Sequence, residues 1–215
     1  FSPDNLLSHG YRTRGNAWYR KSFVLDEAYR GKQLLLCFEG TAVNAEFYFN
    51  GSLMARSFSA YTETVFDITD RAHFGKNTPN ELAVYINGMA TEGWWYEGAG
   101  IYRHVRLYVK EPLHFAHNGI YAKPVLRPGS KNAWSVELEC ELENSAYTAQ
   151  SGRVRAVLMD GDKEIAVSEG AELACPANST VLARQRFTVK RPTRWDVDNP
   201  KLYTLRVTLE KDGEA

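Results

Sequence analysis

The chain has 215 residues, and its 26 Lys and Arg balance its 26 Asp and Glu to a formal net charge of zero. Nucleic-acid binding needs a local excess of basic residues, and the charges here are interspersed, so we exclude a nucleic-acid partner. No stretch approaches the roughly 20 consecutive apolar residues of a membrane-spanning helix, so we also exclude a membrane partner.

Apolar and polar residues alternate through most of the first half, which is typical of half-buried β-strands. The pattern is clearest at 43–51, where Phe47 and Phe49 share one face and Tyr48 takes the other. Asn50-Gly51 then predicts a tight hairpin turn, because both residues tolerate positive φ angles. No segment of ten or more residues holds a helical period. We expect strands at 19–25, 33–40, 43–49, 52–58, 80–87 and 101–110.

Arg103 is unusual within this pattern. Uninterrupted alternation over 101–110 places it on the inward face with Ile101 and Val105. A guanidinium that points inward is tolerated only when it is paired and hydrogen-bonded. We therefore expect a carboxylate partner for Arg103, with Asp67 as the best local candidate.

Pro112 marks a change to longer strands with fewer aromatic residues. We expect these strands at 117–126, 134–144, 153–170, 181–189 and 202–213, the third being a hairpin that turns at Asp160-Gly161. Six or seven strands in about 100 residues predict an immunoglobulin-like sandwich. The predicted boundary lies near 111–113, which divides the chain into domains at 1–111 and 112–215.

The metal-binding residue types indicate no metal or cofactor. Cys37, Cys140 and Cys175 lack paired spacing, which argues against a zinc site or a dense disulfide framework. We expect buried free thiols, with a Cys140–Cys175 disulfide as the alternative. The five histidines have no partners at a recognised ligand spacing. The sequence likewise contains no nucleophile elbow and no phosphate-binding loop.

A cluster of aromatic residues between glycines is the strongest functional candidate. It consists of Glu92, Trp94, Trp95, Tyr96 and Glu97. Three consecutive bulky rings cannot all point inward, so at least one faces solvent or a partner. Exposed rings beside carboxylates suit sugars, whose C–H faces stack on the rings while their hydroxyls bond to the acids. The alternative is that the Trp residues cap the core or pack against another domain.

Several motifs occur in an order that resembles glycoside hydrolase family 2, which includes β-galactosidases, β-glucuronidases and β-mannosidases. The motifs are GNAWYRKSF at 15–23, FEGTAVNAEFYFNG at 38–51, TVFDITD at 64–70, NELAVYI at 80–86 and WWYEGAGIYRHVRL at 94–107. The closing stretch at 192–213 resembles the end of the family's second domain. The resemblance covers essentially the whole chain.

The resemblance implies an all-β fold, in which a jelly-roll, galactose-binding-like sugar-binding domain at 1–111 precedes an immunoglobulin-like β-sandwich domain at 112–215. It also implies a retaining glycosidase that acts on a β-galactoside or related β-glycoside. In the family the two catalytic glutamates lie in a following (β/α)₈ barrel. We therefore expect no catalytic residue here, an inactive isolated stretch, and the C-terminal barrel of the same parent chain as its partner.

The resemblance also suggests substrate-binding residues. In the family, the loop before the strand that begins with Gly-Ile-Tyr-Arg leans over the barrel pocket, and an acid there can touch the sugar. Trp94 occupies that position in this chain, with Glu92 and Glu97 as the nearest acids, so these three join Trp95 and Tyr96 as candidates.

Related enzymes suggest export to the periplasm or secretion, and the assembly of this protein as a homo-oligomer is left open. The chain begins with Phe1 and ends without a closing element, which we interpret as a piece of a longer protein. The alternative function is a stand-alone carbohydrate-binding module without hydrolase activity. A sandwich that serves only adhesion or scaffolding would leave the aromatic cluster unexplained.

Overall fold

The computed structural model describes residues 15–89 and 98–211. Contacts between residues divide the chain into two units, Phe1–Lys110 and Glu111–Ala215. Apart from strands, the described residues form two single-turn 3₁₀ helices, η3 at Glu27–Tyr29 and η4 at Thr69–Arg71. No helix among them has the length and apolarity that crossing a membrane requires. The sequence-based expectation of an all-β fold is confirmed.

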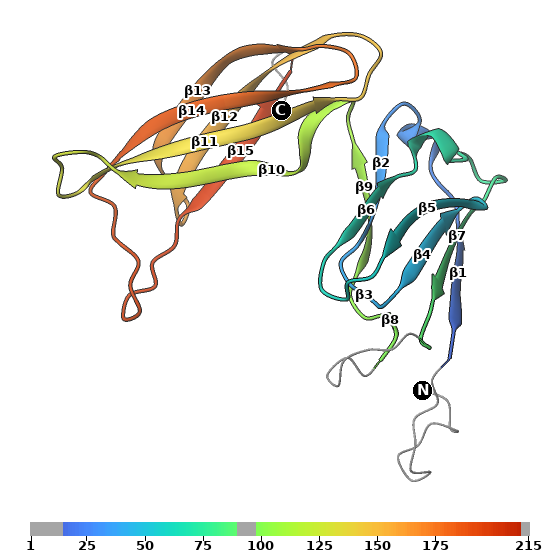
Figure 1. Cartoon of the computed structure of the whole chain (residues 1–215). Coiled ribbons are helices and arrows are strands. Elements are labelled where there is room, and N and C mark those ends of the chain that lie inside the picture. Colours follow the sequence, from blue (N-terminus) through green and yellow to red (C-terminus); the bar gives the residue numbers. More distant parts are fainter. Residues whose placement is uncertain (1–14, 90–97, 212–215) are drawn as a thin grey trace. The chain divides into compact units, whose positions relative to one another are not determined.

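The first unit is a sandwich of short strands, shown in blue to green in Figure 1. One sheet has the order β1-β7-β4-β5, a second has the order β6-β2-β9, and β3 pairs with β8 in a two-stranded ladder. All of these pairings are antiparallel. The strands are β1 (Ala17–Phe23), β2 (Gln33–Phe38), β3 (Thr41–Ala42), β4 (Ala45–Phe49), β5 (Ser52–Ser57), β6 (Thr64–Asp67), β7 (Asn80–Ile86), β8 (Gly100–Ile101) and β9 (Val105–Lys110).

Strand β4 shows how alternation builds this unit. Ala45, Phe47 and Phe49 are buried, whereas the residues between them face outward. Phe49 pairs with Ser52 across the turn, and the turn residues Asn50 and Gly51 have φ angles of 47° and 80°. The predicted hairpin between β4 and β5 is therefore confirmed.

Aromatic rings fill the core of the first unit. The Phe38 ring centroid lies 4.6 Å from that of Phe47 and 6.0 Å from that of Phe66. Asn80 is buried at the start of β7, where its Nδ2 donates to the His73 carbonyl at 2.7 Å and its Oδ1 accepts from the His73 amide at 2.8 Å. This buried amide connects the loop before β7 to the sheet through two hydrogen bonds.

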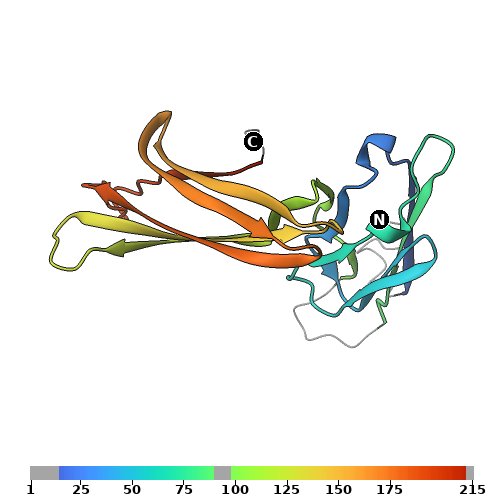
Figure 2. The same cartoon turned by 90° about the horizontal axis from the view of Figure 1, so that it is seen from above.

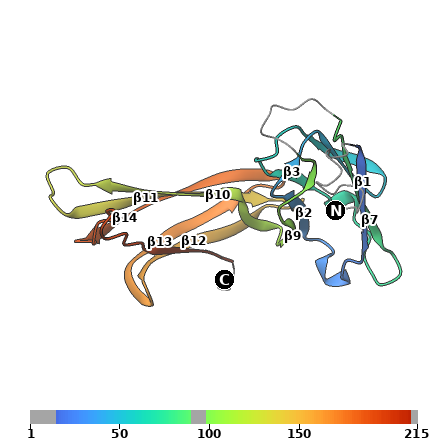
Figure 3. The ribbon, with the colours of Figure 1, turned by 90° about the horizontal axis from the view of Figure 1, so that it is seen from below.

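The second unit has longer strands, which appear in yellow-green to red in Figure 2. They form two antiparallel sheets, β10-β11-β14 and β13-β12-β15. In Figure 3 the β10 and β11 ribbons lie in one layer, and those of β12 and β13 in the other. The strands are β10 (Leu113–Leu126), β11 (Ala133–Asn144), β12 (Gln150–Asp160), β13 (Lys163–Cys175), β14 (Ser179–Lys190) and β15 (Thr204–Glu210).

The core of this second sandwich is mainly aliphatic. Leu138, Leu142 and Val154 are fully buried between the two sheets. The β12–β13 hairpin forms as expected but turns at Gly161-Asp162, one residue later than predicted, because Asp160 still pairs with Lys163.

A buried amide also connects a loop to the second sandwich. The Asn144 Nδ2 lies 2.9 Å from the Thr148 carbonyl and 3.0 Å from those of Cys175 and Pro176, while its Oδ1 accepts from the Ala146 amide at 3.0 Å. Buried polar groups are stable when they are hydrogen-bonded in this way. Asn144 therefore holds the chain that leaves β11 against the end of β13.

All three cysteines are free and buried, so the expectation of buried thiols is confirmed and the alternative Cys140–Cys175 disulfide is wrong. Cys140 pairs with Ala183 between β11 and β14, whereas Cys175 pairs with Gln150 in the other sheet.

Burial raises the pKa of the Cys140 thiol to about 11. Burial, together with a hydrogen bond to Glu63, likewise raises the pKa of Cys37 to about 11.

Candidate functional site

The candidate residues Glu92, Trp94, Trp95, Tyr96 and Glu97 lie outside the described residues. The structure describes the chain on both sides of them, from the end of β7 at Ile86 to Met89 and from Gly98 to β8. The geometry of the site is therefore built from these two flanks and their neighbours in the first unit.

Both flanks are fixed at the same end of the first sandwich. On one side the Asn87 amide donates to the Asn44 carbonyl at 3.1 Å. On the other side Gly100 pairs with Ala42 in the β3–β8 ladder. Asn44 and Ala42 are two residues apart in the chain between β2 and β4, so one short segment holds both flanks.

Close backbone approaches explain the glycines at this end. A Cβ atom added to Gly88 would lie 2.2 Å from the Gly15 carbonyl oxygen, which is too close for any side chain. Gly100 has a φ of 136°, and an added Cβ would lie 2.7 Å from the Tyr19 hydroxyl. A larger residue at position 88 would have to displace the backbone at Gly15, and one at position 100 would have to move the Tyr19 side chain and adopt a strained φ.

Arg103 does not point inward, and the expected ion pair with Asp67 is wrong. Its side chain is exposed, and its guanidinium carbon lies 5.3 Å from the Tyr102 ring centroid. Within the described ranges no carboxylate lies within ion-pair distance of it, and Asp67 instead accepts hydrogen bonds from Gln33 and Thr69. The expected strand is interrupted at 102–104, so alternation does not continue from β8 into β9.

Tyr102 holds the irregular segment at 102–104 in place between β8 and β9. Its backbone amide donates to the Gly40 carbonyl at 3.3 Å, and its hydroxyl donates to the Ala60 carbonyl at 2.5 Å. About half of its side chain remains exposed. Tyr61, in the same β5–β6 connection as Ala60, is also exposed. The chain after the candidate residues therefore carries exposed aromatic surface.

The Glu39 carboxylate forms ion pairs with His104, at the end of the segment at 102–104, and with Arg106 on β9. Glu39 Oε1 accepts from Arg106 Nε at 2.5 Å, and its Oε2 lies 3.1 Å from His104 Nδ1. The hydrogen bond from Arg106, then that from His104, lowers the pKa of Glu39 below its ordinary value. The carboxylate stays ionised near neutral pH and fixes the start of β9.

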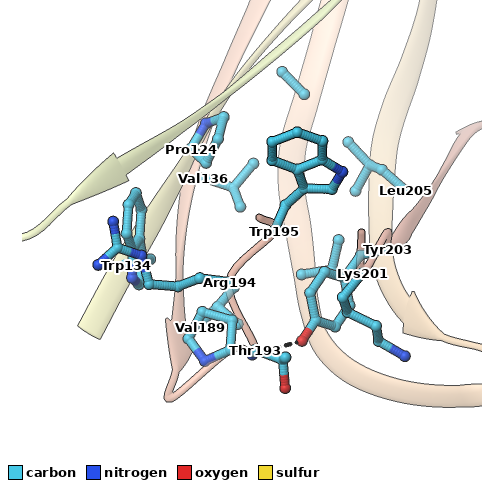
Figure 4. Close-up of a pocket in the computed structure, with 13 residues that line it drawn as sticks. Pro124, Trp134, Val136, Val189, Thr193, Arg194, Trp195, Lys201, Tyr203 and Leu205 are labelled. Carbon is cyan, nitrogen blue, oxygen red and sulfur yellow. Dashed lines mark hydrogen bonds between the residues drawn. The ribbon is translucent and has the colours of Figure 1, made fainter. Parts of the chain in front are cut away.

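The second unit contains a separate cavity of about 460 Å³. Figure 4 shows Trp134, Trp195 and Tyr203 around it, and the Thr193 amide donates to the Tyr203 hydroxyl at 2.8 Å. The Arg194 guanidinium carbon lies 5.7 Å from the Trp134 ring centroid. The lining of the cavity is mostly apolar and contains no carboxylate, histidine or thiol. The cavity therefore suits packing or binding rather than acid–base chemistry.

Sequence reasoning did not find this cavity. Trp134 lies within the expected strand at 134–144, which forms β11. Trp195 is 58% exposed on the long connection between β14 and β15. The available signal was the pair of prolines, Pro192 and Pro200, which marks 191–203 as a long irregular segment.

Two family models match the chain. The model of the glycosyl hydrolase 2 galactose-binding domain-like family matches residues 1–98, and the model of glycosyl hydrolases family 2 matches residues 119–215. Together they cover most of the sequence, in the order that the motifs indicated.

Relatives and solved structures agree with these models. A β-galactosidase of Bacteroides ovatus is 34% identical over 94% of this chain and 23% of its own length. A β-glucuronidase of Formosa agariphila is 24% identical over 97% of this chain and 24% of its own. The crystal structure of a family 2 member from Bacteroides cellulosilyticus has a TM-score of 0.88 at 27% identity, over 99% of this chain and 29% of that one. The chain spans about a quarter of the length of these relatives.

Proposed function

Because this chain belongs to glycosyl hydrolase family 2, we propose that it is the non-catalytic N-terminal part of a retaining, β-galactosidase-like glycosidase. The observation that carries the proposal is the ordered match of both family models to sandwiches that superpose on a family 2 structure over almost the whole chain. The relatives named as β-galactosidase and β-glucuronidase support a β-glycoside as the substrate.

In this proposal the bond cleavage belongs to a barrel that the described residues do not contain. A retaining glycosidase uses two carboxyl groups roughly 5–5.5 Å apart. One attacks the anomeric carbon while the other protonates the leaving oxygen, and water then releases the sugar with its configuration retained. The contribution of this chain is to position the substrate, which lowers the barrier without any proton transfer.

The candidate residues would form one wall of the sugar site. Trp94, Trp95 and Tyr96 would stack on the C–H faces of the sugar, while Glu92 and Glu97 would accept hydrogen bonds from its hydroxyls. The fixed flanks support this role, because Asn87 and Gly100 are both held at one end of the first sandwich, by Asn44 and Ala42.

The activity is tested by comparing the 215-residue chain with the product of its full reading frame on aryl β-galactosides and β-glucuronides. We expect no turnover by the chain alone. We expect turnover with retention by a product that continues for about 250 residues, the length of a barrel. A frame that closes soon after Ala215, or turnover by the chain itself, would contradict the proposal; the former outcome would favour a stand-alone carbohydrate-binding module.

The wall is tested in the full-length product by the double change Trp94→Ala and Trp95→Ala. We expect kcat/KM for the aryl glycoside to fall at least tenfold, because the stacking surface is lost. Tyr147→Ala is the matched control, since Tyr147 is 87% exposed in the second unit and its removal should leave kcat/KM unchanged. Equal kinetics for both variants would show that Trp94 and Trp95 have only a structural role.

A further inference from the structure

Three aromatic rings gather on the outer face of the β1-β7-β4-β5 sheet, whose strands lie side by side in Figure 1. Trp18 on β1 pairs with Tyr85 on β7, and their ring centroids are 5.1 Å apart. The Tyr48 ring on β4 lies 5.6 Å from that of Trp18. We call Trp18, Tyr48 and Tyr85 the aromatic platform. More than half of Trp18 is exposed, at 53%, so the platform offers its indole to solvent.

Polar side chains hold the platform in place. The Tyr48 hydroxyl donates to Glu46 Oε2 at 2.5 Å, and Glu46 Oε1 accepts from Arg56 Nε at 3.0 Å. The Arg20 guanidinium carbon lies 5.9 Å from the Trp18 ring centroid. Because Glu46 is held by two donors, the position of the Tyr48 ring is fixed before any ligand arrives. Such pre-organisation reduces the entropy that binding costs.

The platform is too small for a stable protein interface. An aromatic side chain covers roughly 150–250 Å² when fully buried, and Tyr48 and Tyr85 are already half-buried. Its free area is therefore well below the roughly 800 Å² that each partner of a stable protein complex contributes. An exposed ring of this size matches the face of one or two sugar units.

We propose that the aromatic platform binds a neutral polysaccharide, with a sugar ring stacked on Trp18. The hydroxyls of that sugar would meet Glu46 and Arg56 at the edge of the platform. These two side chains form an ion pair, so the edge that meets the sugar offers hydrogen-bond donors and acceptors to hydroxyls and carries no net charge of its own. The binding site needs none of the residues 92–97, so this inference does not rest on the proposed sugar-site wall.

The experiment is affinity electrophoresis of the 215-residue chain in native gels that contain hydroxyethyl cellulose or galactomannan. We expect both polysaccharides, or one of them, to retard the chain. Trp18→Ala should raise the dissociation constant at least tenfold, and Trp18→Tyr should restore much of the binding. Tyr147→Ala is the control, because Tyr147 is an exposed aromatic residue of the second unit, at 87%, and should change the constant less than twofold.

Several outcomes would overturn the inference. One is the absence of retardation by either polysaccharide. A second is binding that survives Trp18→Ala but is lost in the Trp94→Ala, Trp95→Ala variant, which would leave the proposed wall standing. Retardation by polygalacturonate alone would indicate charge attraction instead. A dimer that Trp18→Ala dissociates in size-exclusion chromatography would show a protein interface. An unchanged unfolding midpoint confirms that the variants fold.

Discussion

Both units are β-sandwiches, but the chemistry of their cores differs. The first has strands of two to seven residues around a core in which four phenylalanine rings pack among aliphatic side chains. The second has strands of up to 14 residues around an aliphatic core, together with the cavity of about 460 Å³. The cavity lies where residues of the connection at 191–203 face strand residues of the second sandwich. The difference predicts distinct responses to substitution.

The largest effect is expected from Phe47→Ala in the first core. Phe47 is fully buried between the rings of Phe38 and Phe66, so its removal leaves a cavity and should lower the free energy of unfolding by about 3–5 kcal/mol. Hydrogen exchange measured by mass spectrometry should show lost protection in residues 17–110 and unchanged protection beyond them. Phe58→Ala is the control, since Phe58 is 85% exposed. Equal loss of hydrogen-exchange protection in both units would contradict the expectation that the two cores unfold independently.

The next effect concerns Asn144 in the second unit. Asn144→Ala removes the two N–H groups that three nearby carbonyl oxygens share, so the free energy of unfolding should fall by about 2–3 kcal/mol. Urea denaturation measures the change. Asn132→Ala removes an amide from an exposed position and should cost less than about 0.5 kcal/mol. A similar result for both variants would mean that water replaces the Asn144 contacts.

A matched pair of enlargements separates the two cores most directly. Val84→Leu adds a methylene to the ring-filled core and should destabilise it by about 1–3 kcal/mol. Val189 is equally buried but lines the cavity, so Val189→Leu should gain about 0.8 kcal/mol from the added burial. The two unfolding midpoints in urea should shift in opposite directions. A shift in the same direction would show that the cavity lining is as tightly packed as the first core.

The smallest effect is a change in acid sensitivity from Glu39→Gln. The lowered pKa of Glu39 means that its ion pair stabilises the fold above the unfolded-state value of about 4.3, and that this stability is lost as the pH falls through the folded-state pKa. Without the carboxylate, the free energy of unfolding should fall less steeply between about pH 5 and pH 2. Because Glu39 lies at the surface, the difference between the variant and the original chain should shrink in 1 M salt.

Local patterns predicted much of the fold because their causes are local. The alternation in β4 and the two positive φ angles of Asn50-Gly51 follow from side-chain and backbone sterics alone. The prediction for Arg103 was wrong because it assumed one strand, whereas Tyr102 hydrogen-bonds to the β5–β6 connection and interrupts the alternation. That contact joins residues 42 positions apart, which no local pattern reports.

The candidate sites also differ in how far the local sequence predicts them. The aromatic cluster at 92–97 was visible because its composition is unusual, and it remains a prediction. The aromatic platform was less visible, because Trp18, Tyr48 and Tyr85 are single outward residues on three strands. Only the strand register brings them together. The cavity likewise depends on where the 191–203 connection lies against two sheets.

The shielding of the three thiols has a practical consequence for measuring how the units are arranged. Cys37, Cys140 and Cys175 are buried, and the raised pKa values of the first two keep them protonated at neutral pH, where maleimides label thiolates. One new surface cysteine in each unit, for example Ser22→Cys and Ser151→Cys, would therefore accept a fluorophore pair against a silent background. Energy transfer between the dyes would then report the distance between the two sandwiches in solution, and its change when a polysaccharide binds.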